Sequence, residues 1–103
     1  MFSASEDIMM HVSTGTALIT GASSGLGALY ADRLSRRGYD LILVARTEDR
    51  LHALASKIGR ESGREVQVLV ADLGSRVDVK KVESVLRNNG RITMLVNNAG
   101  IGA

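Results

Sequence analysis

Eight residues near the start of the chain have the types and spacing best suited to chemistry. Residues 20–27 read Thr-Gly-Ala-Ser-Ser-Gly-Leu-Gly; an apolar run, residues 16–19, precedes them and a helix-like stretch follows. Glycines let a backbone turn sharply and approach a ligand closely. The first N–H groups of the following helix have no intrahelical partner, and the helix dipole adds positive charge beside them. The pattern therefore predicts an anion site, of which a pyrophosphate is the usual occupant.

The spacing of the glycines narrows this interpretation. It is G-x-x-x-G-x-G, which differs from the G-x-G-x-x-G of the general dinucleotide fingerprint, and no Gly-Lys-Ser/Thr follows as in a Walker loop. A glycine trio would also suit a plain connection between a strand and a helix that pack closely. The rest of the chain must decide between the two.

Composition bounds the class of protein. A chain of 103 residues holds one domain, and 45% hydrophobic with 23% charged residues indicates a folded chain. There is no cysteine, which excludes disulfides and thiolate chemistry. The two histidines, His11 and His52, lie far apart in the sequence, and we expect no metal site.

Net charge and hydropathy limit the partners and the location that we expect for the chain. The net charge is only +2, and three aromatic residues are scattered along the chain, so we expect no nucleic-acid partner. No apolar run approaches the ~20 residues of a membrane span. Residues 1–15 include Glu6 and Asp7 and do not resemble a secretory signal. We expect a flexible leader over residues 1–15, a folded unit over residues 16–103, and a cytoplasmic location without membrane contact.

Strand and helix signals alternate along the folded unit. Apolar or β-branched runs predict strands at residues 16–20, 40–45, 66–71 and 92–96. A helix is predicted over residues 25–37, and two more begin after the potential caps Thr47 and Ser75. Helical spacing indicates that the first helix packs through four residues, Leu26, Leu29, Tyr30 and Leu34.

Alternating strands and helices imply right-handed crossovers and a parallel sheet. In such sheets ligands bind beyond the carboxyl ends of the strands. Each distinctive loop of this chain follows a strand: the glycine loop, Ala45-Arg46, Asp72-Leu73 and the Asn-Asn-Ala-Gly run of residues 97–100. Their convergence on one edge predicts a dinucleotide site.

Together these motifs resemble the classical short-chain dehydrogenase/reductase family. The likeness runs from Thr16 to the end of the chain. It implies an α/β fold, a Rossmann-type parallel sheet in the order 3-2-1-4 with helices on both faces, truncated here after the fourth strand. It also implies a nicotinamide dinucleotide as partner, with Asp72 bonded to the adenine amino group, Ala99 and Gly100 along the adenosine ribose, and Asn97 tying the fourth strand to its neighbours. The implied cofactor-binding residues are Gly21, Ser23, Ser24, Gly25, Leu26, Gly27, Arg46, Thr47, Asp72, Leu73, Asn98, Ala99 and Gly100.

The cofactor choice is predicted from the end of the second strand. An NAD-specific fold usually carries an acid about 20 residues past the glycine loop, to accept the ribose hydroxyls. Here Ala45 ends the strand and Arg46 follows. Arginine can hold a 2′-phosphate through two parallel N–H bonds, and Thr47 can add a hydroxyl or an amide. We therefore favour NADP(H) over NAD(H).

Catalytic residues are not expected in this chain. The family relies on a Tyr-x-x-x-Lys pair with a Ser and an Asn, and the chain stops at Ala103 before those positions. Tyr30 and Tyr39 are each followed four residues later by leucine and are interpreted as packing residues. The chain is thus predicted to be the NADP(H)-binding part of a carbonyl/alcohol oxidoreductase, inactive alone. The alternatives are a non-catalytic nucleotide-binding or interaction module, or a non-functional truncated product.

The fourth strand is expected to form an edge of the sheet. Residues 92–96 are apolar and contain no proline, and only Arg91 lies beside them. Natural edge strands are blunted by charge, proline or bulges. The sequence therefore predicts self-association through this strand.

Overall fold

The computed structural model describes residues 14–23 and 25–98. Strands and helices alternate as predicted, and the elements are β1 (Gly15–Thr20), α2 (Gly25–Arg36), β2 (Tyr39–Ala45), α3 (Glu48–Ser62), β3 (Val66–Val70), α4 (Arg76–Asn88) and β4 (Ile92–Asn97). Residues 1–13, which make up most of the expected leader, lie outside the described residues.

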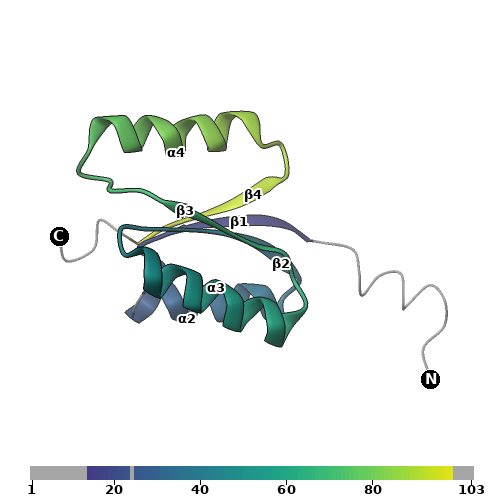
Figure 1. Ribbon diagram of the computed structural model, residues 1–103. Helices are drawn as coiled ribbons and strands as arrows, with labels where there is room; N and C mark the ends of the chain where they lie inside the picture. The colour runs from purple at the N-terminus through teal and green to yellow at the C-terminus, as the bar shows by residue number, and fades with distance from the viewer. Residues whose placement is uncertain (1–13, 24, 99–103) are drawn as a thin grey trace, which may run out of the picture.

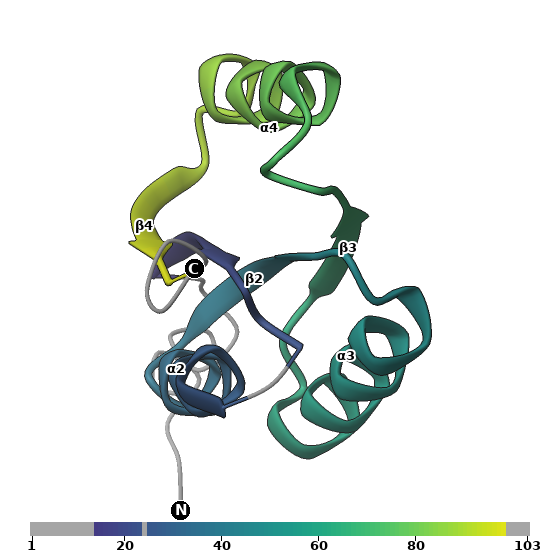
Figure 2. The same ribbon diagram turned by 90° about the vertical axis from the view of Figure 1, so that its left-hand side faces the viewer.

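The strands form one parallel sheet in the order β3-β2-β1-β4, which confirms the expected order. In this register Leu18 of β1 lies between Ile42 of β2 and Leu95 of β4. Parallel neighbours need crossover connections, and each crossover here contains a helix. Helices α2 and α3 cover one face of the sheet and α4 covers the other (Figures 1 and 2).

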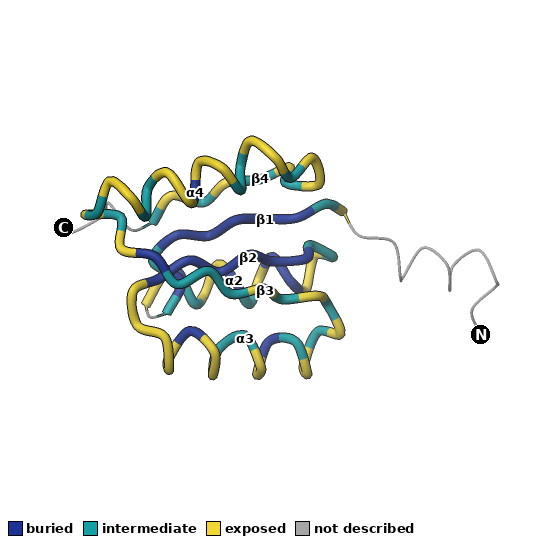
Figure 3. The backbone as a smooth tube through the Cα atoms, turned by 45° about the horizontal axis from the view of Figure 1, so that its top comes forward, coloured by how far each residue is buried: buried dark blue, intermediate teal, exposed yellow. Residues whose placement is uncertain are grey.

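The core lies on both faces of the two central strands. Successive strand side chains point to opposite faces. Ile19 and Leu43 therefore pack on the α2 and α3 side, whereas Leu18, Ile42 and Val44 belong to the cluster that includes Val82 of α4. Burial on both faces explains why β1 and β2 are almost continuously apolar. Figure 3 shows both strands as the buried middle of the molecule.

The packing face of α2 differs from the predicted one. Its buried residues are Gly27, Ala31, Leu34 and Ser35. Of the four side chains expected to pack, only Leu34 is buried; the other three are 40–51% exposed, namely Leu26, Leu29 and Tyr30. The buried side of α2 is made mostly of small residues, and at Gly27 the backbone of residues 21 and 22 lies too close for a side chain, so the large residues face outward.

The residues of the outer strand β4 alternate between partly buried and exposed, and Leu95 is 51% exposed. Its position at one side of the described sheet agrees with the expected edge; self-association through it stays a prediction. No helix in the described part of the chain has the length and apolarity needed to cross a membrane. The same residues include no group of three or more His, Cys, Asp or Glu placed to hold a metal ion.

An ion-pair cluster holds together the strand starts, at what we call the amino edge of the sheet. Asp40, at the start of β2, accepts hydrogen bonds from Arg64 Nε at 3.2 Å and from the Glu65 N–H at 3.1 Å. Arg91, just before β4, lies 3.7 Å from the other carboxylate oxygen. The side chains of Asp40 and Arg64 are only 10% and 14% exposed. The cluster therefore links the entries of β2, β3 and β4.

We expect Asp40→Ala to lower the free energy of unfolding by about 3 kcal/mol, because it leaves the largely buried Arg64 without its carboxylate. Asp32→Ala is the matched control. Its Arg36–Asp32 pair has a similar N–O distance, 3.1 Å, but the two side chains are 68% and 38% exposed. The control should cost less than about 0.5 kcal/mol. Urea unfolding of both variants measures the two losses of unfolding free energy. Equal losses would show that the burial of the Asp40 cluster does not strengthen its ion pairs.

Candidate functional site

The loop after β1 is shaped by its glycines in two ways. Gly21 and Gly25 have φ values of 64° and 57°, in the left-handed region that favours glycine. A Cβ at Gly27 would collide with the carbonyl oxygen of Gly21 and lie 2.9 Å from the Cα of Ala22. Gly27 is therefore required by the chain's own backbone. Ser24, another predicted site residue, lies outside the described residues.

Thr20 joins the end of β1 to the end of β4. Its hydroxyl donates to Asn97 Oδ1 and accepts from the Asn98 N–H, each at 3.0 Å. The Asn98 side-chain amide in turn donates to the Gly21 carbonyl at 3.3 Å. These bonds confirm that Asn97 ties β4 to its neighbour. They also place Asn98, a predicted cofactor-binding residue, as a support of the glycine loop. Ala99 and Gly100 lie outside the described residues.

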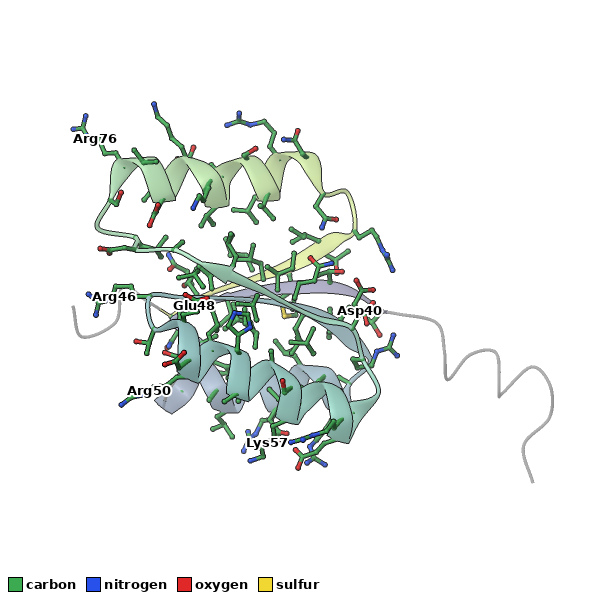
Figure 4. The ribbon with its side chains drawn as sticks, in the orientation of Figure 1. Asp40, Arg46, Glu48, Arg50, Lys57 and Arg76 are labelled. Atoms are coloured by element: carbon green, nitrogen blue, oxygen red, sulfur yellow. The ribbon has the colours of Figure 1, made fainter. Side chains whose placement is uncertain are left out.

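The end of β2 presents Arg46 and Thr47. Arg46 is exposed and forms no ion pair with any described residue. Thr47 occupies the N-cap of α3 with extended backbone, yet its side chain makes no cap hydrogen bond. The first N–H groups of α3 are therefore left without this capping side chain. Figure 4 shows Arg46 and Arg50 projecting at the same end of the molecule, and Arg50 is a cation that the sequence analysis did not single out.

The end of β3 presents Asp72 and Leu73. Asp72 is exposed, and its Oδ1 accepts the Gly74 N–H at 2.8 Å. Leu73 is half-buried against the cluster beneath α4. Backbone bonds link this end to its neighbours, because the Ala71 N–H donates to Ala45 O at 3.0 Å.

The carboxyl ends of all four strands meet at one edge, which we call the carboxyl edge. The predicted site residues that the structure describes follow these strand ends: Gly21, Ser23, Gly25, Leu26, Gly27, Arg46, Thr47, Asp72, Leu73 and Asn98. A small pocket lined by Thr16, Asp40 and Arg91, among others, lies at the amino edge. Figure 4 shows Asp40 and Arg46 at these opposite ends. The carboxyl edge combines glycine-loop backbone, open helix N–H groups and an exposed arginine, and it can bind an extended anion.

Comparison with known proteins agrees with this geometry. The family model for short chain dehydrogenases matches residues 15–103. The chain belongs to this family. It is 38% identical over 87 residues to the very-long-chain 3-oxoacyl-CoA reductase of Yarrowia lipolytica, an alignment that covers 82% of this chain and 22% of the relative. The chain spans about a quarter of the length of such curated relatives.

Two solved structures extend the comparison. A short-chain dehydrogenase from Sphingobium yanoikuyae in complex with NADPH is 54% identical, with a TM-score of 0.78 over 79% of this chain and 32% of that one. The bulky-bulky ketone specific alcohol dehydrogenase from Comamonas testosteroni is 47% identical, with a TM-score of 0.84 over 89% and 38% of the two chains. The short-chain dehydrogenase family consists of oxidoreductases that bind a nicotinamide dinucleotide, so the carboxyl edge is the place to test for such binding.

The glycine loop generates a prediction with an internal control. Gly27→Ala should destabilise the fold by about 2 kcal/mol or more, because the new methyl group meets backbone atoms that cannot move aside. Gly59→Ala, also within a helix, places its Cβ 3.8 Å from the carbonyl oxygen of Arg64, an ordinary van der Waals contact, and should stabilise by up to about 1 kcal/mol. Thermal unfolding measures the change in melting temperature of each variant relative to the wild type. Equal behaviour would show that α2 does not need glycine at its contact with the loop.

Proposed function

We propose that this chain forms the NADP(H)-binding part of an oxidoreductase that interconverts alcohols and carbonyl compounds. The observation that carries the proposal is the residue after β2, where Arg46 stands in place of an acid. A carboxylate at this position would accept the ribose hydroxyls of NAD and repel the 2′-phosphate of NADP. An arginine attracts that phosphate.

The surroundings of Arg46 support this role. Several other arginines are committed to carboxylates within the chain: Arg36 to Asp32, Arg64 to Asp40 and Arg87 to Glu83. Arg46 has no such partner among the described residues, although acidic residues follow it at 48 and 49. Its guanidinium can therefore offer parallel N–H bonds to a phosphate without first breaking an ion pair. The NADPH complex of the Sphingobium relative is consistent with the same preference.

The remaining parts of the dinucleotide have matching groups along the carboxyl edge. The pyrophosphate would lie on the glycine loop at the start of α2, where N–H groups and the helix dipole favour an anion. The adenine amino group would bond to Asp72, which is exposed at the end of β3. The adenosine ribose would lie against residues 99 and 100. In this assignment Thr20 and Asn98 hold the loop that receives the phosphates.

When bound, the reduced cofactor would donate a hydride to a carbonyl carbon, and the oxidised cofactor would accept one from an alcohol carbon. Neither tyrosine of the chain lies in a loop that directly follows a strand. Tyr39 begins β2 at the amino edge and packs against the core, and Tyr30 lies on the exposed side of α2. In this proposal the described residues bind and orient the dinucleotide.

Arg46→Asp should weaken NADPH binding by about ten- to a hundredfold, which corresponds to loss of a charge-assisted hydrogen bond to phosphate. NADH binding should change by less than about threefold, because NADH lacks the 2′-phosphate. Titration calorimetry with both nucleotides measures the ratio. Arg60→Asp is the control: it makes the same charge change in the last turn of α3. At ~1.5 Å per residue, Arg60 lies roughly 18 Å along α3 from the start of the helix, or about two Debye lengths at physiological salt.

The control should leave the ratio of the two dissociation constants unchanged. Equal losses for NADPH and NADH in Arg46→Asp would contradict the assignment of the 2′-phosphate. A wild-type protein that binds neither nucleotide would contradict the proposed function as a whole.

A further inference from the structure

We propose that Asp78 of α4 is a positioning residue for Asp72, and that it thereby sets the selectivity of the site for adenine over other bases. This inference rests on the proposed function, which assigns the adenine amino group to Asp72. It concerns a residue outside the family motifs and six positions further along the chain.

The contact that carries the inference is a hydrogen bond across the β3–α4 loop. The backbone N–H of Asp72 donates to Asp78 Oδ2 at 2.7 Å. A bond of this length to a carboxylate belongs to the stronger class of hydrogen bonds. It fixes the backbone of the residue that would read the base.

Two further hydrogen bonds fix Asp72 in the loop. Its carbonyl oxygen accepts the Ser75 N–H at 2.9 Å, and its Oδ1 accepts the Gly74 N–H at 2.8 Å. Among the described residues no hydrogen bond uses Oδ2. The loop therefore fixes Asp72 through its backbone and one carboxylate oxygen, and it leaves the second oxygen as an acceptor. An exocyclic amino group of a base is a donor that fits it.

Asp78 is itself fixed by the first turn of α4. Its N–H donates to Ser75 Oγ at 3.4 Å, and its Oδ1 lies 3.9 Å from Lys81 Nζ. Its side chain is only 25% exposed. An acid in the first turn would also stabilise α4 through the helix dipole, without any effect on the base. The experiment must separate these two roles.

The probe is a pair of nucleotides that differ at one group: NADPH and its deaminated analogue, in which hypoxanthine carries a carbonyl oxygen where adenine carries the amino group. We expect the wild-type protein to bind NADPH about tenfold or more tightly than the analogue, because one charge-assisted hydrogen bond is lost. Asp78→Ala should reduce this preference at least threefold. Asp78→Glu keeps the charge in the first turn and supports folding, but it displaces the acceptor, so it should also reduce the preference.

Two variants should keep the preference. Asp78→Asn retains a carbonyl oxygen that can accept the Asp72 N–H. Ser75→Ala removes the helix cap and weakens the same end of α4, but it leaves the acceptor in place. Dissociation constants for both nucleotides, measured by titration calorimetry on folded protein, give the preference of each variant.

The inference is overturned if Asp78→Ala and Asp78→Glu keep the wild-type preference, even with weaker overall binding, since Asp78 would then act only on stability. It is also overturned if Asp78→Glu keeps the preference and Asp78→Asn loses it, because charge rather than position would then matter. A wild-type protein without any preference for adenine overturns both this inference and the role of Asp72. The test of Arg46, which compares NADPH with NADH, does not depend on that result.

Discussion

Parallel pairing of β1 with β2 on one side and β4 on the other is the constraint on which the rest of the structure depends. Because all strands point the same way, their four exit loops meet at the carboxyl edge and their entries meet at the amino edge. Helices must then cover both faces of the sheet, so the side chains of the central strands are buried and mostly apolar. Thr20 is the last residue of β1, and its hydroxyl forms the hydrogen bonds that join the carboxyl ends of β1 and β4.

The amino and carboxyl edges of the sheet differ in whether their charged groups are paired within the chain. At the amino edge the carboxylate of Asp40 is surrounded by Arg64, Arg91 and a backbone N–H, so charge is neutralised within the chain. At the carboxyl edge Arg46 has no described carboxylate partner, and the first turn of α3 lacks a capping side chain. Paired charges stabilise a fold, whereas unpaired donors remain available to a ligand. This difference supports the carboxyl edge as the proposed binding surface.

Much of this arrangement could be predicted from the sequence, because burial on both faces imposes a pattern that is easy to recognise. The apolar run of residues 40–45 predicted a central strand, and alternation with helices predicted parallel pairing. The order 3-2-1-4 came from the family resemblance, since apolar runs alone do not specify which strand lies beside which. The packing face of α2 was predicted wrongly because large apolar residues were given more weight than Gly27, Ala31 and Ser35. These small residues recur every fourth position on the buried side of the helix, and Gly27 lies against the backbone of residues 21 and 22. The bonds of Thr20 and Asp78 depend on strand register and loop path, and sequence spacing does not reveal them.

A site built on loops needs bonds that order those loops before a ligand arrives, because ordering them on binding would weaken affinity. In the proposed site Asn98 supports the glycine loop and Asp78 supports Asp72, and neither bond requires the cofactor. Arg46 is different, since nothing in the described structure fixes its long side chain. The charge of a phosphate acts at a distance and tolerates this freedom, whereas a single amino group on a base is distinguished only by an acceptor held in place. The chain would thus read the two ends of the adenosine moiety by two physical means: an exposed charge for the phosphate and a fixed oxygen for the base.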